Sequence, residues 1–259
     1  MLSEISNAKN ELIYPDKFER ENSFDFRRAK IAQIYNLYQS KLIENNAMDF
    51  DDIIMYTVTL LESNKDVLEH YNRKFKYVHV DEYQDTNTAQ FKLISLLAKG
   101  SGNLCVVGDD DQSIYAFRGA NIKNILEFEK KYSKTAVIKL EQNYRSTKNI
   151  LNTANSVIAQ NTLRKPKKLW TSNEEGFKTY LYLTENETEE ASLVANEIRR
   201  LEALGDINFK DAAILYRTNA QSRAIENVFR RENIPYKIVA GTSFYQRMGI
   251  KDTVAYLLT

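Results

Sequence analysis

The stretch Tyr77-Val78-His79-Val80-Asp81-Glu82-Tyr83-Gln84-Asp85-Thr86 decides how the rest of the chain is interpreted. Its first four residues form a short apolar run of β-favouring types, which is typical of a buried strand in a parallel sheet. The run stops at two adjacent carboxylates, Asp81 and Glu82. Open α/β sheets bind ligands at the carboxyl ends of their strands, and two acids there can hold a hydrated Mg²⁺ and orient an attacking water. The alternative is an acidic turn that caps the next helix, with Thr86 as the N-cap.

The composition limits the classes of protein to consider. The chain has 259 residues, enough for one large domain or two ordinary ones, with 43% hydrophobic and 27% charged residues, as in soluble globular proteins. The formal net charge is +1, so a contact with nucleic acid has to come from a local groove. One cysteine excludes a disulfide framework, and two histidines far apart argue against a zinc site. No apolar stretch approaches the roughly 20 residues of a membrane helix, so we expect a cytoplasmic protein without a membrane partner.

A helical region precedes the deciding stretch. Residues 1–22 are polar and have no clear period, whereas apolar residues after Ser23 recur at three-and-four spacing and predict a helix. Asp49 is the expected N-cap of the next helix, with Asp51 and Asp52 in its first turn, where the helix dipole favours anions. A metal site at these three acids is the less favoured alternative, because capping already accounts for them.

Three strand–loop–helix units are expected in succession. Strands at 77–80, 104–107 and 136–140 are each followed by a polar cluster and then by a helix, and Cys105 is expected to be buried in the second strand. This order predicts a parallel sheet with right-handed crossovers. After a connector with the basic run 164–168, a second α/β set is expected. Its strands would lie at 179–183, 212–216 and 236–240, with a last amphipathic segment from Lys251.

Three loops should then converge at one edge of the sheet. The first carries Asp81, Glu82, Gln84 and Asp85; the second, 108–119, mixes acids with Gln112, Tyr115, Phe117 and Arg118; the third is 142–146. Phosphoryl transfer needs such parts, namely metal-holding acids, a water-orienting group and cations against developing charge. Aromatic rings beside a cationic groove can stack on unpaired bases, although a place in the core is the alternative for Phe117.

Five blocks resemble the superfamily 1A DNA helicases of the UvrD/PcrA/Rep group. Residues 80–87 are similar to their motif II, 107–120 to motif III, 140–147 to motif IV, and 216–223 and 234–239 to the next blocks. The order and spacing agree, and the resemblance covers nearly the whole chain from about Ala8. It implies an α/β fold of two incomplete RecA-like parallel-sheet domains. Residues 1–47 would be a remnant of the helical 1B insertion, 48–140 the C-terminal part of domain 1A, and 141–259 the N-terminal part of domain 2A.

The resemblance also implies ATP and Mg²⁺ as cofactors and gives roles to individual residues. Asp81 would hold Mg²⁺, Glu82 would activate the attacking water and Gln112 would sense the γ-phosphate. Tyr144 would stack on adenine, and Arg145 would act as an arginine finger. Contacts with single-stranded DNA would come from Tyr115, Phe117, Arg118, Arg217 and Asn219.

Some positions leave alternatives open or depart from the family pattern. A salt bridge beside a helix is an equal alternative for Arg217, and a solvated connector is favoured over a DNA patch for residues 164–168. Phe117 stands where the family pattern has tryptophan, so stacking would use a smaller ring.

One element of the family pattern is absent from the sequence. No G-x-x-x-x-G-K-[ST] loop occurs, and this loop supplies the main grip on phosphate. We therefore expect an internal part of an ATP-dependent 3′-to-5′ DNA helicase. It would expose unpaired strand edges and apolar faces, and it would be inactive alone. Its partners would be single-stranded DNA, duplex junctions and the missing parts of the same helicase. The alternative is a truncated, non-catalytic protein that holds single-stranded DNA or a partner; a helicase–nuclease subunit is a weaker enzyme alternative.

Overall fold

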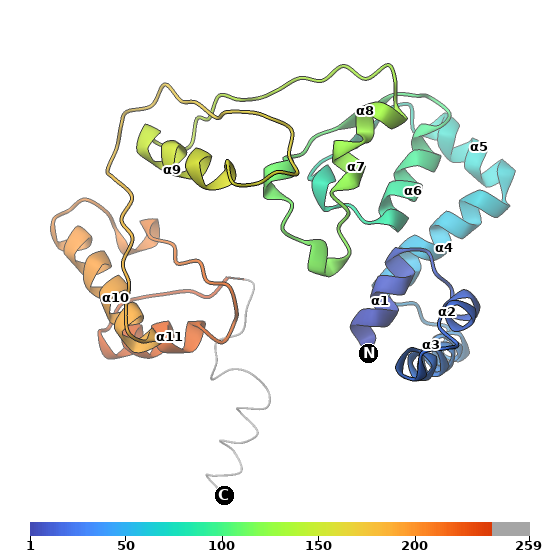
Figure 1. Ribbon diagram of the computed structural model, residues 1–259, viewed down its shortest axis with the longest axis horizontal. Helices are drawn as coiled ribbons and strands as arrows, with labels where there is room; N and C mark the ends of the chain where they lie inside the picture. Colours follow the sequence, from blue (N-terminus) through green and yellow to red (C-terminus); the bar gives the residue numbers. More distant parts are fainter. Residues whose placement is uncertain (240–259) are drawn as a thin grey trace, which may run out of the picture. The chain divides into compact units, whose positions relative to one another are not determined.

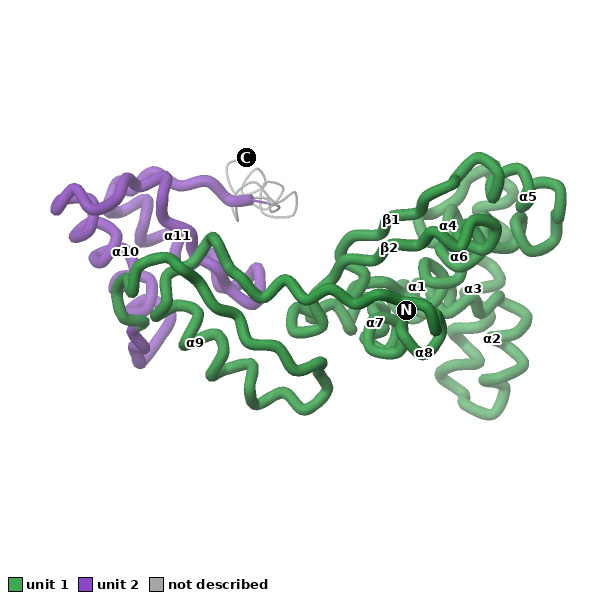
Figure 2. Tube along the Cα trace, turned by 90° about the horizontal axis from the view of Figure 1, so that it is seen from above, with its two compact units in different colours: residues 1–179 green, residues 180–259 purple. Residues whose placement is uncertain are grey.

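The structure is a computed structural model that describes residues 1–239. Two compact units divide the chain, Met1–Thr179 and Tyr180–Thr259 (Figure 2). Part of the predicted strand at 236–240 and the segment predicted from Lys251 lie outside the described residues. The domain boundaries expected after residues 47 and 140 stay predictions.

Five helices precede the sheet (Figure 1). They are α1 (Leu2–Asn10), α2 (Pro15–Glu21), α3 (Phe26–Glu44), α4 (Phe50–Ser63) and α5 (Lys65–Lys74). Sequence patterning predicted α3 and α4 but missed α1 and α2, which are short and bury few apolar side chains. A small core joins α1, α2 and α3; its buried members are Ile5, Ala8, Phe18, Ile31, Ala32 and Tyr35.

The acids at the start of α4 cap the helix, as predicted. The backbone N–H of Asp52 donates to Asp49 Oδ1 at 2.8 Å, and the backbone N–H of Asp49 donates to Asp52 Oδ2 at 3.2 Å. The fully buried ammonium of Lys9 lies 2.7 Å from Asp49 and 2.8 Å from Asp52. These acids therefore act as a cap and as partners of a buried lysine, which ties α1 to α4.

A two-stranded parallel sheet follows the helices. Strand β1 (Val78–Val80) pairs with β2 (Leu104–Val106), with His79 opposite Cys105, and α6 (Thr88–Ala98) connects them. The coarse prediction of an α/β arrangement is confirmed. The expected burial of Cys105 is wrong, because Cys105 and His79 are both exposed while their neighbours in each strand are partly covered. Only one face of this sheet is therefore packed.

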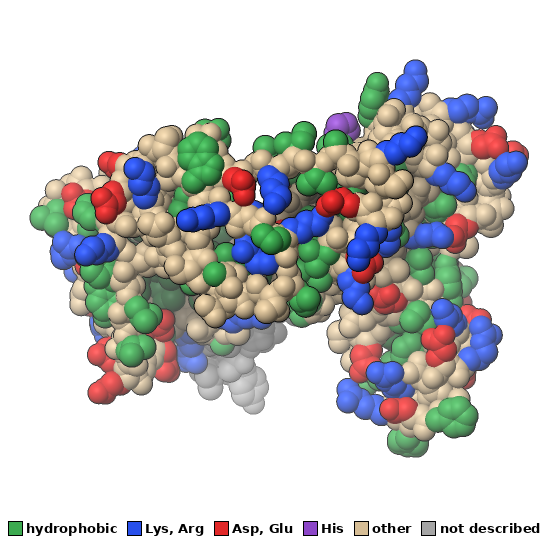
Figure 3. Space-filling model, turned by 45° about the horizontal axis from the view of Figure 1, so that its top comes forward, with side chains coloured by type: hydrophobic (Ala, Val, Ile, Leu, Met, Phe, Trp, Pro, Cys, Tyr) green, Lys and Arg blue, Asp and Glu red, His purple; other side chains and the backbone are tan. Residues whose placement is uncertain are grey.

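The other predicted strands are not formed within residues 1–239. The segments 136–140, 179–183 and 212–216 form no strand, because none of them meets a neighbour that completes a hydrogen-bonded ladder. The prediction of a parallel sheet in the second domain is therefore wrong for residues 1–239. Large apolar side chains of these segments are exposed, as expected for unpaired strands; examples are Ile138 at 81%, Leu181 at 88% and Leu215 at 92%. Figure 3 shows hydrophobic side chains lying among charged ones on the face in view.

The remaining elements carry the loops of interest or build the second unit. Short 3₁₀ turns lie at η1 (Tyr83–Asp85), η2 (Asp110–Gln112) and η3 (Ala116–Arg118), followed by helices α7 (Lys123–Leu126), α8 (Phe128–Lys131) and α9 (Lys148–Ile158). The second unit has α10 (Glu187–Ala203), η4 (Phe209–Asp211) and α11 (Ser222–Arg231), around a core of Ala191, Ala195, Val228, Phe229 and Ile234. Within residues 1–239, none of the helices combines the length and apolar composition needed to cross a bilayer.

Candidate functional site

The acidic pair after β1 does not cap the next α-helix, α6. Asn87, not Thr86, is the N-cap of α6, and it forms a reciprocal capping box with Gln90. Thr86 instead donates its hydroxyl to the carbonyl of Tyr83 at 2.7 Å. The capping alternative for this stretch is therefore wrong, and Asp81 and Glu82 are exposed at the end of the strand.

Glu82 has an unusual backbone conformation. Its φ is 48° and its ψ is 41°, the left-handed region that residues other than glycine rarely adopt. The Asp81 carboxylate accepts the backbone N–H of Glu82 at 2.9 Å. Strained backbone positions concentrate at functional sites, so this turn is a candidate on structural grounds as well.

Gln84 connects the ends of the two strands. Its side chain is buried, its Nε2 donates to Glu82 Oε2 at 2.7 Å, and its Oε1 accepts the backbone N–H of Asp109 at 2.9 Å. A Cβ at Gly108 would lie 2.5 Å from Gln84 Oε1, so the glycine makes room for this contact. Sequence reasoning placed Gln84 in the loop but gave it no role, because its second partner lies 25 residues away.

The first and second loops line one cavity of about 520 Å³. Its walls are formed by Glu82, Gln84, Asp85, Asp111, Gln112, Ile114 and Tyr115. Gln112 Nε2 donates to Asp109 Oδ2 at 2.8 Å. Burial and the neighbouring Glu82 carboxylate raise the pKa of Asp85. The convergence predicted for these two loops is therefore observed, with acids and carboxamides around one open space.

The donor set at this cavity is compatible with Mg²⁺ rather than with a protein-only metal cage. Among residues 1–239 the structure contains no cluster of three or more His, Cys, Asp or Glu arranged to hold a metal ion. Mg²⁺ is usually held by one or two carboxylates together with waters and substrate phosphates. Glu82 is on the cavity wall and Asp81 directly precedes it after β1, and two such carboxylates fit that requirement.

An aromatic–arginine cluster follows the cavity along the chain. The ring centroids of Tyr115 and Phe117 are 5.9 Å apart, and Arg118 Cζ lies 5.3 and 5.6 Å from them. The Phe117 side chain is 63% exposed, so the alternative that places it in the core is wrong. A second cavity of about 490 Å³ has walls formed by Ser3, Ser6, Asn7, Asn10, Phe50, Asp51, Ile54, Asn87, Gln90, Phe117 and Arg118.

The third loop does not line the first cavity. Tyr144 is 77% exposed and donates its hydroxyl to Gln142 Oε1 at 2.9 Å. Asn143 Oδ1 accepts the backbone N–H groups of Arg145 and Ser146 at 2.9 and 2.7 Å. Asn143 thus shapes the turn that leads into α9, and Tyr144 and Arg145 stay outside the walls formed by Glu82 and Gln112.

Arg217 and Asn219 belong to the second unit. Both are exposed, and the Asn219 carbonyl accepts the hydroxyl of Ser222 at 2.9 Å, which shapes the turn before α11. Their predicted role in DNA contact stays a prediction.

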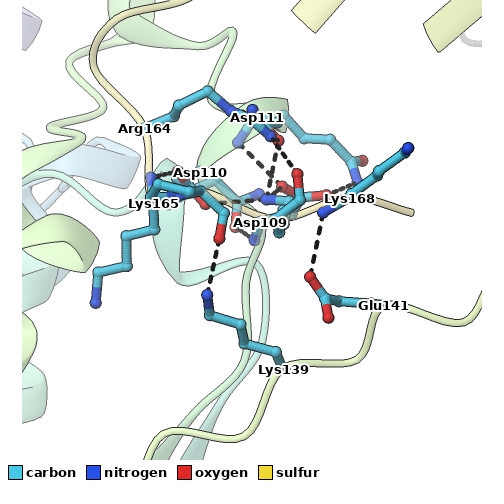
Figure 4. Close-up of polar contacts among 12 residues, drawn as sticks. Asp109, Asp110, Asp111, Lys139, Glu141, Arg164, Lys165 and Lys168 are labelled. Carbon is cyan, nitrogen blue, oxygen red and sulfur yellow. Dashed lines mark hydrogen bonds and ion pairs between the residues drawn. The ribbon is translucent and has the colours of Figure 1, made fainter. Parts of the chain in front are cut away.

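Two cations of the basic run 164–168, Arg164 and Lys167, are paired with acids instead of being solvated as predicted, whereas Pro166 and Lys168 are exposed. Arg164 makes two hydrogen bonds to Asp111 (Figure 4). Lys167 contacts the carboxylates of Asp109, Asp110 and Asp111. The Arg164 guanidinium holds the pKa of Asp111 below its ordinary value. Burial alone would raise the pKa of Asp109, but hydrogen bonds from Lys167 and Gln112 outweigh it and lower that pKa.

Comparison with known proteins places these loops in context. Residues 1–133 match the model of the UvrD/REP helicase N-terminal domain, and residues 138–259 match that of the UvrD-like helicase C-terminal domain. The chain is 52% identical over 257 residues to the ATP-dependent DNA helicase PcrA of Bacillus subtilis, covering 99% of this chain and 35% of that helicase. It is 53% identical over 253 residues to PcrA of Staphylococcus epidermidis and of Staphylococcus aureus, covering 98% of this chain and 34% of each. The chain thus spans about a third of the length of these relatives.

Proposed function

Because the chain belongs to the UvrD/REP helicase family, we propose that it forms part of an ATP-dependent 3′-to-5′ helicase that moves along single-stranded DNA and opens duplexes at junctions. Its two parts would be incomplete RecA-like domains after a 1B remnant, working in the cytoplasm and completed by the rest of the same helicase. One observation carries the proposal. The segment from η2 to η3 contributes Gln112 and Tyr115 to the first cavity and Phe117 and Arg118 to the second, so a single short segment borders both spaces.

The first cavity is the proposed nucleotide side. Asp81 would hold Mg²⁺, which when bound would neutralise charge on the phosphates. Glu82 would accept a proton from the attacking water, and Gln84 orients Glu82 through their 2.7 Å hydrogen bond. Gln112 would face the γ-phosphate, while Tyr144 would stack on adenine and Arg145 would stabilise negative charge during phosphoryl transfer.

The second cavity is the proposed nucleic-acid side. The exposed ring of Phe117 would stack on a base, with the Tyr115 ring beside it, and Arg118 would add a cation near the phosphates. The exposed Asn7 offers an amide group that could pair with a base edge or a sugar, whereas Asn10 and Asn87 are buried and hydrogen-bonded to each other at 2.8 Å. Arg217 and Asn219 would contact DNA from the second unit.

A direct test is the affinity of this chain for a labelled oligothymidine, followed by fluorescence anisotropy. Replacing Phe117 by Ala should weaken binding by about 1–3 kcal/mol if the ring stacks on a base. Phe24→Ala is the matched control, because Phe24 is fully exposed and lines neither cavity. Unchanged affinity in Phe117→Ala, together with a lowered melting temperature, would show that Phe117 stabilises the fold and does not contact DNA.

A second candidate function is non-catalytic binding of single-stranded DNA or a partner. The exposed ring of Phe117, with Arg118 beside it, suits such binding without a nucleotide. A steady-state ATPase assay with single-stranded DNA separates the candidates. Turnover of about 1 s⁻¹ or more by this chain alone would contradict its proposed inactivity and supply a catalytic function.

A further inference from the structure

Two cations of the connector, Arg164 and Lys167, form ion pairs with three consecutive acids of the second loop, 109–111. Arg164 Nε and an Nη lie 2.7 and 2.6 Å from the two carboxylate oxygens of Asp111, a bidentate pair. Lys167 Nζ contacts Asp109, lies 3.0 Å from Asp110 and 3.1 Å from Asp111. The Arg164 and Lys167 side chains are only 15% and 17% exposed, so water screens these contacts less than ordinary surface pairs. We call these five residues the Asp–Arg–Lys joint.

The joint reaches Gln112 through Asp109. One carboxylate oxygen of Asp109 accepts Lys167 Nζ and the backbone N–H of Asp111, and the other accepts Gln112 Nε2 at 2.8 Å. Asp109 is therefore fully engaged between the connector and the cavity. Removing the Lys167 ammonium would leave that oxygen with only the Asp111 N–H, which weakens the hold on the carboxylate and on the Gln112 amide bonded to it.

The joint also reaches the third loop through the connector itself. The backbone N–H of Lys168 donates to Glu141 Oε1 at 3.1 Å (Figure 4), and the backbone N–H of Trp170 donates to the Glu141 carbonyl at 3.0 Å. The backbone N–H of Asn143 donates to the Trp170 carbonyl at 2.7 Å. Asn143 in turn shapes the Tyr144–Arg145 turn.

We propose that Arg164 and Lys167 are positioning residues that couple the Gln112 loop to the Tyr144–Arg145 loop. The contacts run without a gap from Gln112 through Asp109, Lys167 and the connector to Asn143. They join residues of the part that matches the N-terminal domain to residues of the part that matches the C-terminal domain. These contacts support the coupling between the two loops. Its consequence for ATP hydrolysis rests on the proposed function.

Hydrogen exchange of the full chain, measured by mass spectrometry, tests the coupling. In Arg164→Gln/Lys167→Gln, peptides covering 108–113 and 141–145 should both exchange faster, by about tenfold or more, because local opening of both loops becomes easier. Lys165→Gln is the matched control: it removes one charge from the same run, but its side chain pairs with Glu129 and its backbone N–H still donates to Asp110. Lys167→Arg should keep wild-type exchange in both peptides.

A charge swap keeps the test valid should the double variant fail to fold. Arg164→Asp should loosen both loops, and Arg164→Asp/Asp111→Arg should restore protection in both. Faster exchange confined to 108–113, no change in either peptide, or failure of the swap to restore protection would overturn the coupling. The assay contains neither nucleotide nor DNA, so its outcome is independent of the proposed helicase function.

Discussion

Gln84 holds Glu82 in place: 2.7 Å separates Gln84 Nε2 from Glu82 Oε2, and the side-chain oxygen Oε1 of Gln84 accepts the backbone N–H of Asp109 at 2.9 Å. The buried amide therefore spans the ends of both strands of the sheet. Glu82 itself has a left-handed backbone at φ 48°, which neighbouring contacts have to maintain. The orientation of the proposed water-activating acid thus depends on a neighbour that carries no charge.

Replacing Gln84 by Met should destabilise the chain while nearly preserving side-chain volume. The part-buried Asp109 N–H would lose its partner, and a buried group left unpaired costs about 1–3 kcal/mol; the exposed Glu82 carboxylate would lose a hydrogen bond that water can replace. Urea unfolding of the chain measures this loss. Gln160→Met is the control, since Gln160 is exposed. Equal stability of Gln84→Met and the wild-type chain would mean that the two hydrogen bonds do not hold the strand ends together.

Replacing Glu82 by Gln should abolish ATP hydrolysis in a longer helicase that contains this sequence and should leave nucleotide binding intact. The amide cannot accept a proton from water, and general-base catalysis contributes about 10²–10⁴-fold to a rate. Single-turnover hydrolysis and the affinity for a labelled nucleotide measure the two effects separately. Glu202→Gln, an exposed position in α10, should change neither. Loss of nucleotide binding in Glu82→Gln would point to a structural role for the acid.

Local signals in the sequence predicted the parts of the fold that neighbouring residues determine. Asp49 was predicted as a cap because it precedes an apolar run, with Asp51 and Asp52 in the first turn, where the helix dipole favours anions. The strand ending at Val80 was also predicted from a local signal, a short apolar run that stops at two acids. The segments 136–140 and 212–216 have the composition of strands, but a strand also needs a neighbour, and none pairs with them in the described part of the chain.

Contacts between distant residues were beyond sequence patterning. The run 164–168 has the composition of a solvated connector, and its pairing with Asp109–Asp111 across more than 50 residues depends on tertiary structure. The same is true of Lys9, which has no apolar character but is fully buried against Asp52. The only sequence signal for the Asp–Arg–Lys joint is weak: an acidic run at 109–111 and a basic run at 164–168 have opposite charges.

Replacing Lys9 by Met should strongly destabilise the N-terminal helices. The change leaves the buried carboxylate of Asp52 without its cation, and breaking one side of a buried pair costs about 3–5 kcal/mol. Chemical unfolding of the chain, followed by circular dichroism, measures the effect. Lys41→Met removes a lysine from an exposed pair with Glu44 and should cost about 0–1 kcal/mol. A Lys9→Met cost as small as that of Lys41→Met would show that the buried pair adds little.

The Asp–Arg–Lys joint should weaken in acid and at high pH, and hold in between. The pKa values of Asp109 and Asp111 are lowered in the folded chain, so their contribution is complete above the unfolded value of about 3.9 and is lost as pH falls through the folded values. Burial alone would lower the pKa of Lys167, but the three acids raise it. Its contribution is therefore complete below the unfolded value of about 10.4 and is lost as pH rises through the folded value.

The difference in unfolding free energy between the wild-type chain and Arg164→Gln/Lys167→Gln isolates this dependence, because other acids titrate in both proteins. Between about pH 5 and pH 9 the difference should be constant, since neither the acids nor Lys167 change charge there. Below about pH 4 it should shrink, because protonated Asp109 and Asp111 no longer attract the two cations in the wild-type chain. Lys165→Gln, compared with the wild-type chain in the same way, should differ little at any of these pH values, since its more exposed pair with Glu129 contributes less. A difference for the double variant that stays the same from pH 7 down to about pH 3 would mean that the carboxylates do not stabilise the folded chain through Arg164 and Lys167.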